Sequence, residues 1–139
     1  MVVHFPIALL LTGVGVDLAA RALRRPVWHR VALWNLALGT AAAGLAVGTG
    51  LRAEAVAKHS FEIWQVMALH ERLGITTLIL GLLSVSWRLA KRDELTRRAR
   101  LLTIVVSLVM IGTLAWGAHL GGRLVYEFGV GGLFGHVGE

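Results

Sequence analysis

Long apolar segments alternate with short clusters of charged residues along the chain. The predominantly apolar runs cover about residues 4–23, 31–51, 63–90 and 101–122. Each run is about twenty residues or longer, and a helix of that length crosses the roughly 30 Å hydrocarbon layer of a bilayer. Residues 1–139 are therefore predicted to form a single integral membrane domain. Its fold class is all-α, a transmembrane four-helix bundle with up-down topology, because short connections favour antiparallel neighbours.

The composition supports a membrane location, with the lipid bilayer as the first partner. Hydrophobic residues make up 56% of the 139 residues and charged residues only 16%, whereas soluble domains carry about 25% charged residues. The net charge of +6 would suggest nucleic acid in a soluble protein, but loop bias explains it here and no nucleic-acid partner is expected. The chain has no cysteine, which excludes disulfides, iron–sulfur clusters, thiolate metal sites and covalent c-type haem held by this chain.

The distribution of basic residues predicts the orientation. Ten of the 14 Lys and Arg residues lie around the connections after the first and third runs, and four lie on the opposite side: Arg52, Lys58, Arg72 and Arg123. By the positive-inside rule, the side with ten faces the cytoplasm. We therefore predict a multi-pass protein of a bacterial inner membrane with both termini in the periplasm. The glycine-rich tail, residues 128–139, then lies on the outer side.

Three histidines are predicted to share one level near the outer face. His4, His70 and His119 stand 17, 18 and 19 residues from the basic boundary of their own runs, which corresponds to about 25–29 Å along a helix. Small residues at helical spacing accompany each of them, and small residues mark helix–helix contacts in membranes. We therefore expect all three imidazoles to point into the bundle. The other histidines are interpreted as interfacial or solvent-exposed: His29, His59 and His136.

Level imidazoles on separate helices suggest a bound cofactor. Two of them from facing helices can supply the axial ligands of a b-type haem, and Gly48 at the same depth would leave room for the macrocycle. Arginines on the outer rim would pair with the haem propionates: Arg52, Arg72 and Arg123. Alternatively, the three histidines would bind one zinc or copper ion with a fourth position open.

These features lead to a preferred function and two alternatives. The preferred function is a b-haem electron-transfer subunit that passes electrons between quinol and a periplasmic cytochrome. Its expected partners are a quinone and a cytochrome c or a larger respiratory or photosynthetic membrane complex. The first alternative is a non-redox accessory or assembly subunit of a larger membrane complex. The second is a zinc- or copper-binding membrane protein. No set of catalytic residues is recognised.

A second polar pair is predicted nearer the inner face. Asp17 lies four residues before Arg21, and Asn35 lies five residues after Arg30, so the two side chains reach similar depths. Either a hydrogen bond between Asp17 and Asn35 or an i,i+4 ion pair between Asp17 and Arg21 would satisfy the carboxylate. We interpret the pair as structural, with a proton or quinone site as the alternative.

The two ends of the sequence carry a family resemblance. The opening HFPIALLLTGVGVDLAA and the later GAHLGGRLVYEFGVGG resemble a family of small bacterial membrane proteins catalogued as domain of unknown function 2231. The resemblance covers nearly all of the chain. Members often have a histidine where this chain has Phe128 and a valine where it has Gly132. Members are also similar to segments joined to cytochrome c domains, so the resemblance implies an electron-transfer setting.

Overall fold

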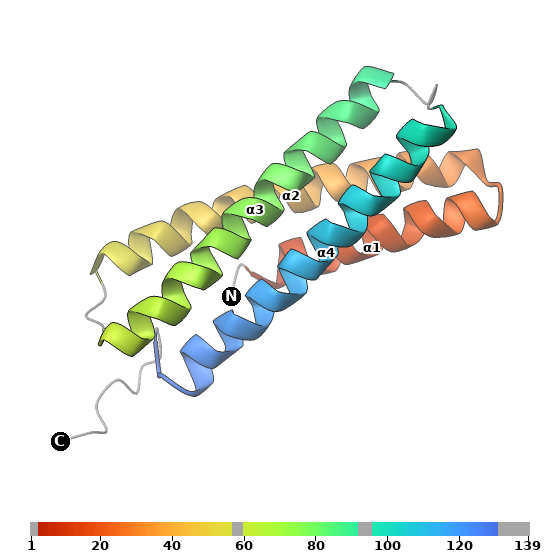
Figure 1. The fold of residues 1–139 in the computed structure, drawn as a ribbon. Coiled ribbons are helices and arrows are strands. Elements are labelled where there is room, and N and C mark those ends of the chain that lie inside the picture. Colours follow the sequence, from red (N-terminus) through yellow and green to blue (C-terminus); the bar gives the residue numbers. More distant parts are fainter. Residues whose placement is uncertain (1–2, 57–59, 92–95, 131–139) are drawn as a thin grey trace.

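The computed structural model describes residues 3–56, 60–91 and 96–130, with backbone only for residues 53–56. It contains four helices (Figure 1): α1 (His4–Ala22), α2 (Pro26–Val56), α3 (Phe61–Lys91) and α4 (Arg97–Tyr126). The predicted four-helix bundle is confirmed. The last three helices extend beyond the apolar runs at both ends, because polar residues outside the hydrocarbon layer continue the same backbone hydrogen bonding. His59, His136 and most of the predicted glycine-rich tail lie outside the described residues.

Local chemistry determines where helices begin and end at the arginine-rich end of the bundle, called the basic end below. α1 stops where Arg24 adopts φ of 51° and the Arg25 N–H turns back to the Ala20 carbonyl at 2.9 Å, a Schellman-type ending. A non-glycine residue in this left-handed region costs roughly 1 kcal/mol. α2 then begins with Pro26, whose fixed φ suits a first helical position. Thr96 caps α4 by accepting from the Ala99 N–H at 3.3 Å.

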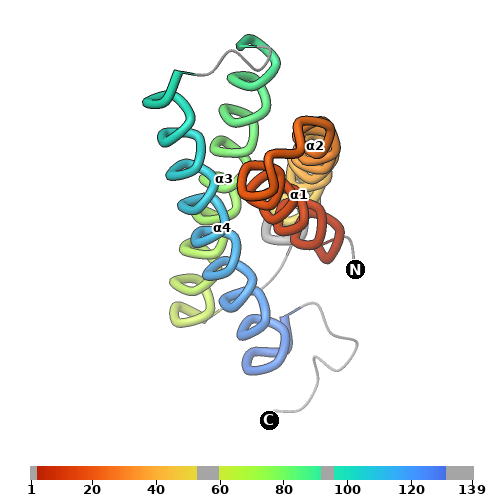
Figure 2. Tube along the Cα trace, turned by 90° about the vertical axis from the view of Figure 1, so that its right-hand side faces the viewer, coloured from red at the N-terminus to blue at the C-terminus, as the bar shows by residue number. Residues whose placement is uncertain are grey.

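The helices form two antiparallel hairpins, α1–α2 and α3–α4, that cross each other (Figures 1 and 2). Packing is most extensive within each hairpin, intermediate between α2 and α3, and slight between α1 and α4. The two hairpins are therefore joined mainly through α2 and α3.

Reciprocal glycine notches bring α1 and α2 together. A Cβ atom on Gly13 would lie 3.0 Å from the Leu36 side chain, and a Cβ atom on Gly39 would lie 3.0 Å from the Leu10 side chain. Each helix thus inserts a fully buried leucine into the other's notch. Membrane helices usually associate by packing small residues that let their backbones approach closely. The surrounding lipid is as apolar as the helices, so the hydrophobic effect does not drive this association.

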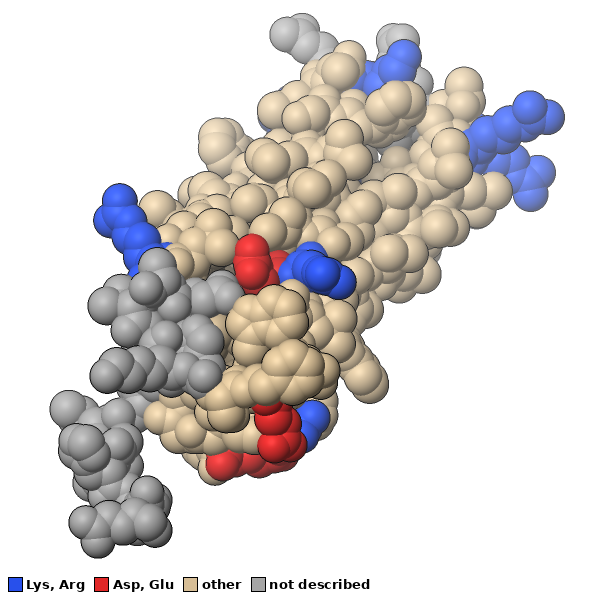
Figure 3. Space-filling model, turned by 60° about the vertical axis from the view of Figure 1, so that its left-hand side comes forward, with Lys and Arg blue, Asp and Glu red and all other residues tan. Residues whose placement is uncertain are grey.

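The interior and exterior are distributed as in a membrane protein. Small polar side chains are buried inside: Thr40, Thr77, Ser84, Thr103 and Ser107. Large apolar side chains face outward, with Leu38, Leu83 and Leu108 all more than half exposed. On the face shown in Figure 3, a belt without Lys, Arg, Asp or Glu separates charged groups at the two ends. All four helices are long and apolar enough to span a bilayer.

Candidate functional site

Only one of the three level histidines points into the bundle. His70 of α3 is half-buried against α4, where its Nδ1 lies 2.8 Å from the Gly117 carbonyl oxygen. A carbonyl can only accept, so in a neutral imidazole Nδ1 carries the proton and Nε2 keeps its lone pair. A Cβ atom on Gly121 would lie 3.0 Å from the imidazole Cε1, so the absence of a side chain at Gly121 accommodates the ring.

The expectation that His119 and His4 also point inward is wrong, because both residues are exposed. His119 is two residues from Gly117, which places it about 200° around α4 from the contact with His70. The ring of His119 lies instead beside Trp116, with centroids 6.0 Å apart. The small residues predicted to share inward stripes with these histidines are largely exposed as well: Ala8, Thr12, Gly15, Gly112 and Ala115.

Among the described residues, none of the other predicted cofactor-binding residues contacts His70. Arg52 and Arg72 are exposed, and Gly48 is exposed with nothing within 4 Å of an added Cβ. Arg123 pairs with Glu127, the residue that follows α4, with Nε 2.8 Å from Oε2. Among the described residues, no group of three or more His, Cys, Asp or Glu could hold a metal ion. His70 and His119 therefore face different directions.

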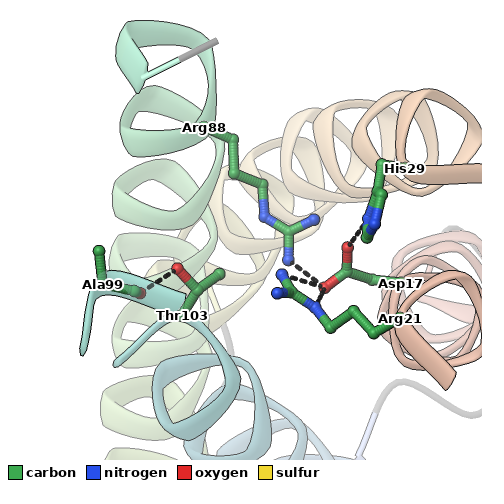
Figure 4. A network of polar contacts seen from close by, with 6 residues as sticks. All are labelled: Asp17, Arg21, His29, Arg88, Ala99 and Thr103. Carbon is green, nitrogen blue, oxygen red and sulfur yellow. Dashed lines mark hydrogen bonds and ion pairs between the residues drawn. The ribbon is translucent and has the colours of Figure 1, made fainter. Parts of the chain in front are cut away.

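The most highly connected polar group lies at the basic end, around Asp17 (Figure 4). Its side chain is only 4% exposed and contacts two arginines and a histidine from three helices. Arg21 of α1 donates from Nε to Oδ2 at 3.0 Å, and Arg88 of α3 donates from Nη2 to the same oxygen at 2.8 Å. His29 of α2 contacts Oδ1 through Nδ1 at 2.9 Å. One carboxylate thus ties both hairpins together where α1 and α3 end.

This network extends and corrects the prediction for the inner polar pair. The Asp17–Arg21 alternative is confirmed, whereas Asn35 contacts Thr12 instead of Asp17, with Nδ2 and Oγ1 3.5 Å apart. His29 was interpreted as interfacial or solvent-exposed; its side chain is 28% exposed and contacts Asp17, a contact that the interpretation did not include. A carboxylate inside an apolar run demands counter-charges, so the sequence contained a signal for such a network, but not the identity of the distant partners His29 and Arg88.

A pocket of about 410 Å³ opens beside the network at the basic end. All four helices contribute to its lining, from Ala20 of α1 and Leu33 of α2 to Arg88 of α3 and Arg100 of α4. Its charged lining consists of four guanidinium groups and one carboxylate, a net charge of +3 with His29 neutral. The sequence prediction did not include this pocket, because its residues are far apart in the chain.

A further polar contact lies on the surface of the α1–α2 hairpin that points away from the bundle. Thr12 is exposed and donates to the Ala8 carbonyl at 2.7 Å. Its oxygen also faces the half-buried Asn35 amide. Thr12 lies nine residues before Arg21, about 13 Å along the helix and hence well inside the hydrocarbon layer.

The fold and its apolar exterior define a multi-pass membrane protein with four spanning helices. The chain belongs to the family DUF2231, described as a predicted membrane protein, whose sequence model matches residues 1–133. This confirms the family resemblance of the two end motifs. No curated protein matches the chain, and no solved structure matches it.

Proposed function

We propose that this protein is an accessory subunit of a larger membrane complex. It would bind transmembrane helices of that complex through the lipid-facing surface of its α1–α2 hairpin. The observation that carries this proposal is the contact between Thr12 and Asn35, which lies at lipid depth on an outward-facing surface. It does not depend on the cofactor that the sequence analysis preferred.

Asparagine is a costly residue to place against lipid. Its amide offers two donors and an acceptor with two lone pairs, and the 3.5 Å contact with Thr12 lies at the weak limit of a hydrogen bond. Hydrogen bonds between membrane helices contribute about 0.6–2 kcal/mol each. A partner helix that offers a polar side chain here would therefore gain such a bond and remove the amide from lipid.

The backbone beside this pair is open to close approach. Gly15 is exposed and has nothing within 4 Å of an added Cβ, and it follows Ala8 and Thr12 on one helical stripe at i+7 and i+3. The face therefore combines small residues, which let backbones meet, with a polar pair that can bond across helices. These are the two recurring components of helix interfaces in membranes.

The test is extraction from native membranes in mild detergent, followed by native gel electrophoresis and mass spectrometry of co-migrating proteins. We expect the wild-type chain to migrate with larger partners and Asn35→Leu and Thr12→Leu to release it. Thr76→Leu is the matched control, because Thr76 is also exposed and donates to its own i−4 carbonyl, that of Arg72, on α3. Migration as a single chain, pairing with itself alone, or equal behaviour of all three variants would refute the proposal.

Haem binding in electron transfer remains a second candidate in a narrower form. It is favoured by the tautomer of His70, whose bonded Nδ1 leaves Nε2 free in the manner of a metal-ligating histidine. His119 does not face His70, so the second axial ligand would come from a partner chain. We expect a reduced-minus-oxidised α band in the native complex that His70→Ala abolishes and His119→Ala retains. Absence of the band in the intact complex would exclude this candidate.

A further inference from the structure

We infer that the basic end binds an anionic glycerophospholipid, with its phosphate in the arginine pocket and one acyl chain in an adjoining apolar groove between α2 and α3. The inference is independent of the proposed accessory function. It rests on three features of the described residues: an excess of positive charge in the pocket lining, an unpartnered donor, and an apolar groove that lies next to the pocket along α2.

The positive charge of the pocket exceeds what the protein itself neutralises. Asp17 binds Arg21 and Arg88 directly, but Arg24 and Arg100 also line the pocket. No carboxylate is paired with either of them among the described contacts. Arginine presents planar, multiple donors that suit phosphate oxygens. Basic pockets between transmembrane helices are established binding places for anionic headgroups.

One donor within this pocket lacks a partner. The Arg88 side chain is only 9% exposed, and its Nε has no hydrogen-bond partner although it is buried. A buried donor on a charged group is costly to leave unsatisfied. Because Arg88 lines the pocket, an anion bound there would bring an acceptor close to this guanidinium group.

The α4 terminus adds to the same imbalance. Arg100 lies in the first turn or so of α4, which has no acidic residue in its first turn. The amino end of a helix carries a partial positive charge, so cations there are unfavourable and anions favourable. An anion bound at the basic end would reduce this repulsion.

An apolar groove lies about one helical turn further along α2 from the pocket. The groove has a volume of about 400 Å³ and is lined by Ala37, Ala41 and Gly44 of α2 opposite Leu78 and Leu82 of α3. Leu33 lines the arginine pocket and lies one turn before Ala37, on the same helical stripe. A ligand with a phosphate and an attached acyl chain can therefore occupy both spaces, which a free phosphate compound cannot do.

The level of the pocket agrees with a lipid headgroup. It lies where the apolar runs of all four helices meet the basic clusters, which is the depth at which phosphates of one leaflet reside. The observations thus favour a membrane lipid over a soluble phosphorylated molecule.

The test is native mass spectrometry of the full-length protein in detergent, titrated with phosphatidylglycerol, phosphatidylcholine or soluble glycerol phosphate. We expect binding of phosphatidylglycerol in preference to phosphatidylcholine. The double variant R24Q/R100Q should weaken phosphatidylglycerol binding about tenfold or more, since it removes two charge-assisted contacts. These arginines do not contact Asp17 in the described structure, so folding is retained, as size-exclusion and circular dichroism would verify.

Two controls decide between specific and diffuse binding. R97Q/R98Q removes the same charge from exposed positions of α4 outside the pocket lining and should leave binding within about twofold of wild type, as expected for screened surface charges. Ala41→Phe fills the groove without touching the arginines and should weaken phosphatidylglycerol binding. Equal loss in R97Q/R98Q, equal binding of phosphatidylcholine, or a full effect with glycerol phosphate and none from Ala41→Phe would overturn the inference.

Discussion

The buried Asp17 network and the exposed Arg123–Glu127 pair provide a controlled comparison within one molecule. Both include an acidic and a basic side chain four residues apart in the chain. The Asp17 side chain is 4% exposed, whereas the Glu127 side chain is 53% exposed and its partner Arg123 is 38% exposed. Asp17→Asn keeps the shape of the side chain but leaves Arg21 and Arg88 without their counter-charge.

The expected magnitude follows from this difference in burial. Removing one partner of a buried ion pair costs about 3–5 kcal/mol. We expect about 3 kcal/mol for Asp17→Asn, the lower end of that range, because the adjoining pocket admits water to the arginines. Glu127→Gln removes a solvent-screened pair, and its expected cost is at most about 0.5 kcal/mol.

The assay is equilibrium unfolding in mixed detergent micelles as the fraction of denaturing detergent rises, followed by circular dichroism. Asp17→Asn should unfold at a clearly lower fraction than wild type, and Glu127→Gln at nearly the same fraction. Because Asp17 joins α1, α2 and α3, hydrogen exchange should also rise first at the ends of α1 and α3. A cost for Asp17→Asn no larger than that for Glu127→Gln would show that the network is not stabilising.

Three further predictions test the packing, the histidines and the orientation. Gly81→Leu should destabilise the protein by about 1–3 kcal/mol in the same unfolding assay, because a Cβ on Gly81 would lie 2.6 Å from Thr40 Oγ1. Leu83→Ala should cost much less, since Leu83 is 59% exposed. Equal costs for the two variants would contradict the assignment of Gly81 to the inward face of α3. His70→Ala should cost about 1 kcal/mol through the lost bond to Gly117, whereas exposed His119→Ala should cost under about 0.5 kcal/mol; equal values would contradict the contact. A reporter fused after Glu139 should be active only in its periplasmic form, because the Lys and Arg residues divide ten to four, and a cytoplasmic signal would invert the orientation.

The fold could be predicted because the membrane imposes a simple rule on length. A span needs about twenty apolar residues, and each of the four helices contains such a stretch. The boundaries were less accurate at α2 and α4, which begin at Pro26 and Arg97, four or five residues before the apolar runs. Charged residues end an apolar run in the sequence, but they do not end a helix whose backbone remains hydrogen-bonded.

The inward faces of α1 and α4 could not be predicted from the same pattern. In a soluble helix one face is polar and identifies the exterior, whereas lipid is as apolar as the core and leaves no such contrast. The inward faces were therefore predicted from the positions of small residues, and this prediction was wrong for His4 and His119. The true α1–α2 contact uses large residues, Leu10 and Leu36, inserted opposite glycines. For α3 the same approach succeeded, since Thr77, Gly81 and Ser84 are buried.

The two roles of the basic end can be separated, because different arginines carry them. Arg21 and Arg88 are held by Asp17, so their charge is largely committed to joining the helices. Arg24 and Arg100 line the same pocket without that commitment and are available to an external anion. Asp17→Asn should therefore lower stability while leaving phosphatidylglycerol binding intact or stronger, since it raises the net positive charge of the pocket. R24Q/R100Q should show the opposite pattern. If both changes lowered stability and lipid binding in parallel, the ligand and the network would form a single structural unit.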